Sequence, residues 1–91
     1  MITMTREEDQ APIDRRGDRY VYQVIAERIA ARIASGELPP GAMLPSEPDL
    51  AEWYGVSRES VRRARQVLEE RGLVHVMHGK GTYVTRPGQA G

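Results

Sequence analysis

The chain has 91 residues, with 13 lysines and arginines against 13 aspartates and glutamates, and it has no cysteine. A chain of this length forms at most one domain, buries only ~60–65% of its unfolded surface and leaves little room for a catalytic cleft. The lack of cysteine excludes disulfides, thiolate metal sites and cysteine nucleophiles. We expect a cytoplasmic protein with no membrane partner, because no segment approaches the ~18 apolar residues of a membrane span.

The balanced total charge neither favours nor excludes a nucleic-acid partner, so the distribution of charge is more informative. Residues 56–86 carry seven lysines and arginines against three glutamates. This half of the chain is therefore modestly basic, less so than many free-standing DNA-binding modules.

Residues 1–18 contain many charged side chains and hardly any apolar ones. Because such a segment cannot offset its ordering entropy by burial, we expect a disordered N-terminal arm. In an alternative, Arg15 and Arg16 reach into a DNA groove, although the interleaved acidic residues favour disorder. We expect the folded domain to span residues 19–86 and residues 87–91 to form a short tail.

From Arg19 onward, apolar residues recur at intervals of three and four, which predicts an amphipathic helix that ends near Ser35. Its core stripe is expected to consist of Tyr22, Ile25, Ile29 and Ile33. Gly36 and the prolines that follow it prevent the helix from continuing. Met43 and Leu44 are expected to form a very short extended piece.

A second helix is predicted to begin after Ser46, whose hydroxyl can accept a backbone N–H of the first turn, and to end at Gly55. Its inward-facing residues are expected to be Leu50, Ala51 and Tyr54. The next helix should cover residues 58–71, with Ser57 as its N-cap and Gly72 at its end. Two helices joined by so short a turn predict a helix-turn-helix, in which the second helix is presented outward.

This third helix has two different faces at 3.6 residues per turn. The apolar face consists of Val61, Ala64 and Leu68, with Leu73 beyond the helix end. The other face carries Arg58, Arg62 and Gln66 as a stripe at i, i+4 and i+8. An isolated pair of arginines is more often a solvated surface, but behind a helix-turn-helix the stripe favours contact with DNA.

After Gly72 the apolar period becomes two, which predicts short strands over residues 73–77 and 82–85. The connection between them is His78, Gly79, Lys80 and Gly81. On its own this tip would be an ordinary hairpin turn, but after a helix-turn-helix it indicates a wing that lays a cation and backbone N–H groups against phosphate or a minor groove. The predicted fold class is α+β, a small winged helix-turn-helix of three helices followed by a two-stranded β-hairpin wing.

The chain offers no convincing catalytic or metal-binding set, so we expect neither an enzyme nor a cofactor. His75 and His78 lie three apart on a strand-like stretch and should point to opposite faces, so they cannot jointly hold a metal as a simple pair. Glu69 and Glu70 lie late in a helix and are expected to face water. The serines at the helix ends are explained by capping.

Several segments together resemble the winged helix-turn-helix DNA-binding domain of the GntR family of bacterial transcription regulators. The similarity covers residues 22–84 through IASGELPPG (33–41), LPSEPDLA (44–51), YGVSRESVRRA (54–64), EERGLV (69–74) and GKGTYV (79–84). Each fragment alone is weak, but their order and spacing together are specific.

The resemblance implies a sequence-specific regulator that binds a palindromic double-stranded DNA operator. Helix 58–71 would enter the major groove, and the tip 78–81 would enter the adjacent minor groove. The residues that match DNA-contacting positions of the family are Ser57, Arg58, Ser60, Arg62, His78 and Gly79, and Lys80 joins them from the charged tip. Arginine suits guanine because its planar fork can donate to O6 and N7 together.

Three positions depart from the family pattern. Pro48 stands where many members have a polar side chain that touches DNA. Glu59 stands where small residues are usual; it could accept a hydrogen bond from cytosine or repel phosphate, but we expect an ion pair with Arg63 at i+4. Arg65 replaces an apolar residue, and we expect its stem to be buried and its head to meet a phosphate or a carboxylate.

The resemblance also implies a homodimer on DNA, while the isolated domain is expected to be monomeric. Family members carry a C-terminal effector-binding domain, so we expect this chain to be the DNA-binding half of a longer regulator, with a small-molecule effector only if such a domain exists. The alternative function is a winged-helix protein–protein interaction module, because a fold alone does not fix a function. Trp53 would then anchor a partner instead of covering the first helix.

Overall fold

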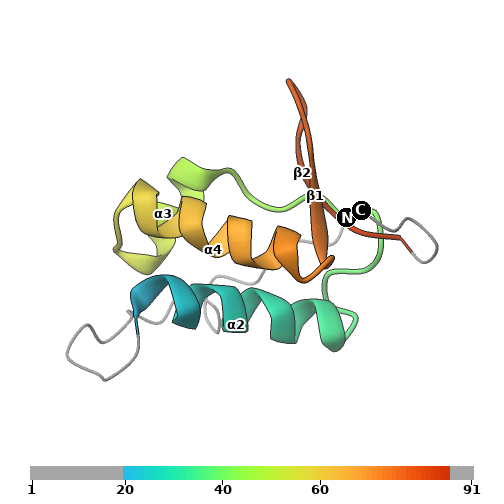
Figure 1. Ribbon diagram of the computed structural model, residues 1–91, viewed down its shortest axis with the longest axis horizontal. Helices are drawn as coiled ribbons and strands as arrows, with labels where there is room; N and C mark the ends of the chain where they lie inside the picture. The colour runs from blue at the N-terminus through green and yellow to red at the C-terminus, as the bar shows by residue number, and fades with distance from the viewer. Residues whose placement is uncertain (1–19, 87–91) are drawn as a thin grey trace.

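The computed structural model describes residues 20–86, so the predicted arm at 1–18 and the predicted tail at 87–91 lie outside the described residues. The described part contains α2 (Val21–Ala34), α3 (Glu47–Tyr54) and α4 (Arg58–Glu70), followed by β1 (Val74–Met77) and β2 (Gly81–Val84). Figure 1 shows the three helices gathered together and the hairpin projecting away from them. The predicted winged helix-turn-helix is confirmed.

The capping residues set the ends of α3 and α4 where the sequence predicts them. The Ser46 hydroxyl accepts the Asp49 N–H at 3.2 Å, and the Ser57 hydroxyl accepts the Ser60 N–H at 3.1 Å. Gly55 ends α3 with φ +67°, a left-handed conformation that glycine adopts without a steric penalty. These local contacts fix the turn between the two helices and hence the direction of α4.

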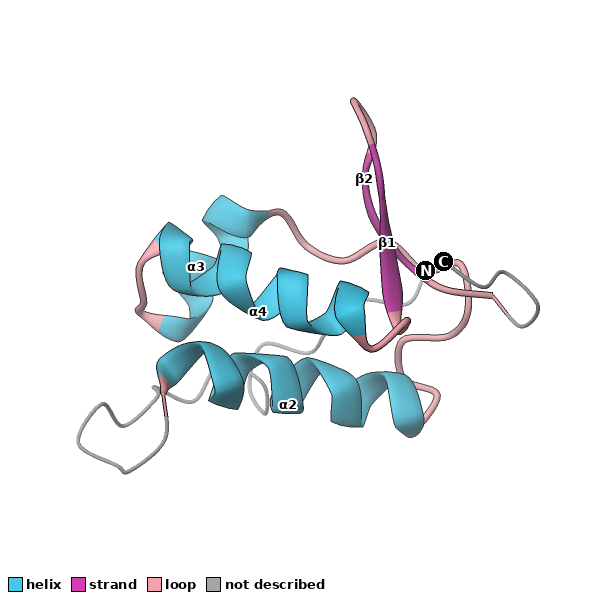
Figure 2. Ribbon diagram, in the orientation of Figure 1, coloured by secondary structure: helices cyan, strands magenta, loops and turns pink. Residues whose placement is uncertain are grey.

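The core lies between α2, α3, α4 and the base of the hairpin. α2 and α3 both pack against α4, as the ribbon in Figure 2 shows. The buried apolar side chains are Ile25, Ala26, Ile29, Leu38, Leu44, Leu50, Ala51, Tyr54, Val61, Ala64, Leu68, Val74 and Val84. All three expected inward residues of α3 and the apolar face of α4 are among them, while Tyr22 and Ile33 of the α2 stripe are only partly buried.

The hairpin is antiparallel, with the register Val74↔Val84, His75↔Tyr83, Val76↔Thr82 and Met77↔Gly81. The predicted extended piece at residues 43–44 is also confirmed, because Met43 forms a bridge with Tyr83 on the outer edge of β2. The Leu44 N–H donates to the Thr82 carbonyl and the Val84 N–H donates to the Ala42 carbonyl, both at 2.8 Å. The loop before α3 therefore pairs along β2 from Val84 to Thr82 and anchors the hairpin.

Within residues 20–86, no helix is both long enough and apolar enough to cross a membrane.

Candidate nucleic-acid interface

The first turn of α4 presents the predicted DNA-contacting residues together. Ser57, Arg58 and Arg62 are exposed, and Ser60 is partly buried. The Ser57 hydroxyl caps the helix and also donates to the Ser60 hydroxyl at 3.1 Å, so the two hydroxyls lie side by side. The buried face of α4, formed by Val61, Ala64 and Leu68, fixes the rotation of the helix, and this rotation turns Arg58 and Arg62 outward.

Arg58 is the first residue of α4. It is exposed, and no acidic side chain or aromatic ring within the described part of the chain contacts it. Its guanidinium can therefore meet a base or a phosphate without first leaving a protein partner.

Arg62 lies between two carboxylates. Its Nη1 donates to Glu59 Oε2 at 3.3 Å, and its Nε lies 3.7 Å from Glu47 Oε1. The side chain remains 46% exposed, so water screens both ion pairs and an incoming ligand can still reach the guanidinium. The two acidic residues hold Arg62 from either side without burying it.

The expected ion pair between Glu59 and Arg63 is wrong. Arg63 instead lies over the ring of Tyr22, with its guanidinium carbon 4.1 Å from the ring centroid. This cation–π contact draws Arg63 toward the start of α2, where Tyr22 also stacks on Tyr20 at a centroid distance of 5.9 Å. Glu59 consequently pairs with Arg62, one residue nearer along the same helix.

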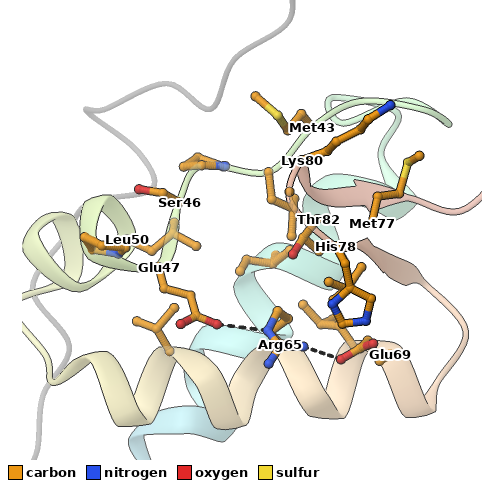
Figure 3. Close-up of a pocket in the computed structure, with 18 of the residues that line it drawn as sticks. Met43, Ser46, Glu47, Leu50, Arg65, Glu69, Met77, His78, Lys80 and Thr82 are labelled. Carbon is orange, nitrogen blue, oxygen red and sulfur yellow. Dashed lines mark hydrogen bonds and ion pairs between the residues drawn. The ribbon is translucent and has the colours of Figure 1, made fainter.

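Arg65 joins α3 to α4, as Figure 3 shows. Its Nε donates to Glu47 Oε2 at 2.9 Å, and its Nη1 donates to Glu69 Oε1. The Arg65 side chain is 22% exposed, which agrees with the expected buried stem and carboxylate-bound head. Glu70 is exposed, as expected, whereas the Glu69 side chain is 36% exposed and its carboxylate pairs with Arg65.

The wing tip presents His78, Gly79 and Lys80 to solvent. The Lys80 N–H donates to the Met77 carbonyl at 2.9 Å, and Gly79 has φ +78°, so the turn requires a left-handed residue at its centre. An open groove of about 730 Å³ separates this tip from the start of α3, and Arg65 and Glu69 of α4 line its floor. Figure 3 shows His78 and Lys80 on the hairpin, where they line the side of the groove opposite α3.

The histidines and Trp53 were also considered as candidate functional residues. His75 lies on β1 and stacks on Tyr83 with ring centroids 6.1 Å apart, whereas His78 lies in the turn. Among the residues that the structure describes, no three potential metal ligands cluster together. Trp53 is partly buried and packs against the core.

Two contributors to this surface have no local signal in the sequence. Glu47 is 18 residues from Arg65, and Tyr22 is 41 residues from Arg63, so helical spacing cannot connect either pair. Tyr22 belongs to the core stripe expected for the first helix, and Glu47 lies in the first turn of α3. Only the packing of α2 and α3 against α4 brings them to the arginines.

Comparison with known proteins places this geometry in a family. The family described as "Bacterial regulatory proteins, gntR family" matches residues 21–84. Among curated relatives, the HTH-type transcriptional repressor NagR of Bacillus subtilis is 42% identical over 67 residues, which cover 74% of this chain and 28% of NagR. The transport and metabolism system repressor MngR of Escherichia coli is 46% identical over 68 residues, covering 75% of this chain and 28% of MngR.

Solved structures agree with the sequence relatives. YtrA from Sulfolobus acidocaldarius, a GntR-family transcription factor, superposes with a TM-score of 0.75 at 35% identity and covers 81% of this chain and 78% of its own. The DNA-binding domain of AraR in complex with operator ORX1 superposes with a TM-score of 0.72 at 31% identity and covers 82% of this chain and 89% of its own.

The matched family consists of DNA-binding regulators and not of enzymes, in agreement with the expectation from the sequence. The chain spans about 28% of the length of NagR and MngR, the part that corresponds to the winged helix. The capped helix-turn-helix, the outward arginines of α4 and the anchored wing are thus those of a DNA-binding domain, and the chain belongs to the gntR family of bacterial regulatory proteins.

Proposed function

We propose that this chain recognises a palindromic operator, with α4 in the major groove and the wing tip in the adjacent minor groove. The observation that carries the proposal is the exposed edge of α4, where Arg58 and Arg62 stand outward from a helix whose opposite face is buried. At the same helix start the Ser57 hydroxyl donates to the Ser60 hydroxyl, and the Ser60 hydroxyl can in turn donate to a phosphate. His78, Gly79 and Lys80 supply the second contact.

Two further features of the proposal concern the whole regulator. Two copies of the domain would occupy the two half-sites, and a longer protein would supply the dimer contacts and the site for any effector. The relatives NagR and MngR are named repressors, and the chain spans only 28% of each. A cytoplasmic location follows for a protein that acts on bacterial DNA.

The test is a salt-dependent titration. A duplex enriched by the chain from a random library is compared with a scrambled duplex of the same composition at several salt concentrations. We expect log K to fall linearly with log salt on both, because counterions are released from phosphates, and to be higher on the enriched duplex at every salt concentration. Equal affinity for both duplexes would contradict sequence-specific recognition and would favour a protein-interaction module.

A further inference from the structure

Glu59 is an acidic side chain placed within the surface that is proposed to meet DNA. It lies in the first turn of α4, its side chain is 68% exposed, and its Oε2 accepts a hydrogen bond from Arg62 Nη1 at 3.3 Å. It stands next to Arg58 in the sequence and one helical turn before Arg62. If α4 bound only phosphates, a carboxylate at this position would weaken that binding, since the two negative charges repel.

The chemistry of base edges restricts what Glu59 can contact favourably. The major groove offers two hydrogen-bond donors, the N4 amine of cytosine and the N6 amine of adenine. Adenine carries its N7 acceptor directly beside N6, and this lone pair repels a carboxylate oxygen. Cytosine has no acceptor on its own major-groove edge, so a carboxylate is accommodated best at cytosine.

The ion pair with Arg62 complements this preference. A guanidinium has five N–H donors, and the hydrogen bond to Glu59 uses only one of them. In a C·G base pair the guanine O6 acceptor lies beside the cytosine amine. Arg62 can therefore donate to guanine while Glu59 accepts from cytosine, and the contact between the two side chains is kept.

We propose that Glu59 and Arg62 act as one unit that recognises a C·G base pair in each half-site. This inference rests on the proposed operator binding. Glu59 is then a specificity-determining residue. Opposite any other base pair, its carboxylate faces DNA without a favourable donor and weakens binding. The same carboxylate lowers affinity for non-operator DNA, where phosphates are the main ligands of α4.

The experiment is selection from a random duplex library, followed by sequencing, with the 91-residue chain and two variants. Glu59→Gln removes the charge but keeps the shape, and its amide pairs best with adenine. Glu70→Gln is the matched control, because it makes the same charge change on an exposed residue at the far end of α4. Thermal unfolding followed by circular dichroism checks that all three chains fold.

We expect the wild-type chain and Glu70→Gln to select the same sequence, with cytosine at one half-site position. Glu59→Gln should lose cytosine at that position alone. On single duplexes, replacing this C·G pair should weaken wild-type binding about 5- to 150-fold, a loss that Glu59→Gln does not show.

Two results would overturn the inference while leaving operator recognition intact. One is an identical selected sequence for wild type and Glu59→Gln, and the other is an equal weakening of preference at every position. If the wild-type chain enriched no sequence, the proposed function itself would be contradicted and the inference would fall with it.

Discussion

The arginines of α4 differ in their freedom to meet DNA. Arg58 contacts solvent, Arg62 lies between two carboxylates, Arg63 covers an aromatic ring, and Arg65 is fixed at the floor of a groove. An arginine that must leave a protein partner loses that contact on binding, so its net contribution to affinity is smaller. Arg58 and Arg62 are therefore the cations of this helix best suited to DNA recognition, whereas Arg65 mainly joins α3 to α4.

Replacing Arg58 and Lys80 should affect recognition differently. Arg58→Ala is expected to relax base preference at one position, because arginine is the common bidentate partner of guanine. Lys80→Ala should weaken binding to all duplexes alike and reduce the slope of log K against log salt by about one. Fluorescence anisotropy on the enriched and scrambled duplexes at several salt concentrations measures both effects. A base-specific loss in Lys80→Ala would show that the wing tip reads sequence.

Glu47 is expected to contribute to stability through its contact with Arg65. Its side chain is 26% exposed and accepts from Arg65 Nε at 2.9 Å, so Glu47→Gln replaces a charged hydrogen bond by a neutral one. Discounted for partial exposure and for the remaining Arg65–Glu69 contact, the loss should be on the order of 1 kcal/mol in urea-induced unfolding. Glu52→Gln, an exposed position on the same helix, serves as the control and should change stability by less than about 0.5 kcal/mol. Equal losses in the two variants would argue against a specific role for this ion pair.

At the scale of elements, the turn between α3 and α4 depends on one backbone conformation. Gly55 has φ +67°, and a Cβ built there meets no atom within 4 Å, so any cost of a side chain comes from the backbone and not from packing. Gly55→Ala should therefore destabilise the fold by about 1–2 kcal/mol. Gly55→Asn should lose less, because asparagine tolerates the left-handed region. Thermal unfolding compares the two, and similar losses would contradict this explanation.

The sequence predicts the elements of this fold well because their ends are determined locally. Ser46, Ser57 and Gly55 each act within four residues of their own position, so capping patterns suffice to place α3 and α4. The predicted partner of Glu59 is wrong, and the contact between Glu69 and Arg65 was not predicted. Arg63 contacts the ring of Tyr22 on α2 instead of Glu59, and Arg65 is bound by both Glu47 of α3 and Glu69 of α4. Such contacts depend on helix packing, which periodicity does not encode.

At the scale of the whole molecule, the domain is small and its total charge is balanced. A balanced total gives no overall attraction to phosphates, so the proposed DNA binding depends on the local charges of the α4 edge and the wing tip. A single copy reaches only one half-site, and its affinity is limited by the few contacts that one helix and one wing provide.

Joining two copies should change affinity more than any single substitution. The 91-residue chain alone is expected to sediment as a monomer and to bind the two half-sites of a palindromic duplex nearly independently. A tandem fusion through a flexible linker long enough to span the half-sites should bind about 10²–10⁴ times more tightly, because the second contact becomes intramolecular. Isothermal titration calorimetry compares the two proteins. An unchanged affinity would show that the half-sites cannot be engaged together in the linked geometry.

Because residues 41–44 pair with β2 and not with the tip turn, we expect the two parts of the wing to open at different rates. Leu44 and Val84 donate the backbone hydrogen bonds that join residues 42–44 to β2 and are buried with the core, while Gly79 and Lys80 lie in an exposed turn. In amide hydrogen exchange, the amides of Leu44 and Val84 should be protected nearly as long as those of α4, and the Gly79 amide should exchange fastest within the hairpin. With this pattern of opening, the tip turn can adjust to the width of a minor groove while α4, the helix proposed to enter the major groove, keeps its position.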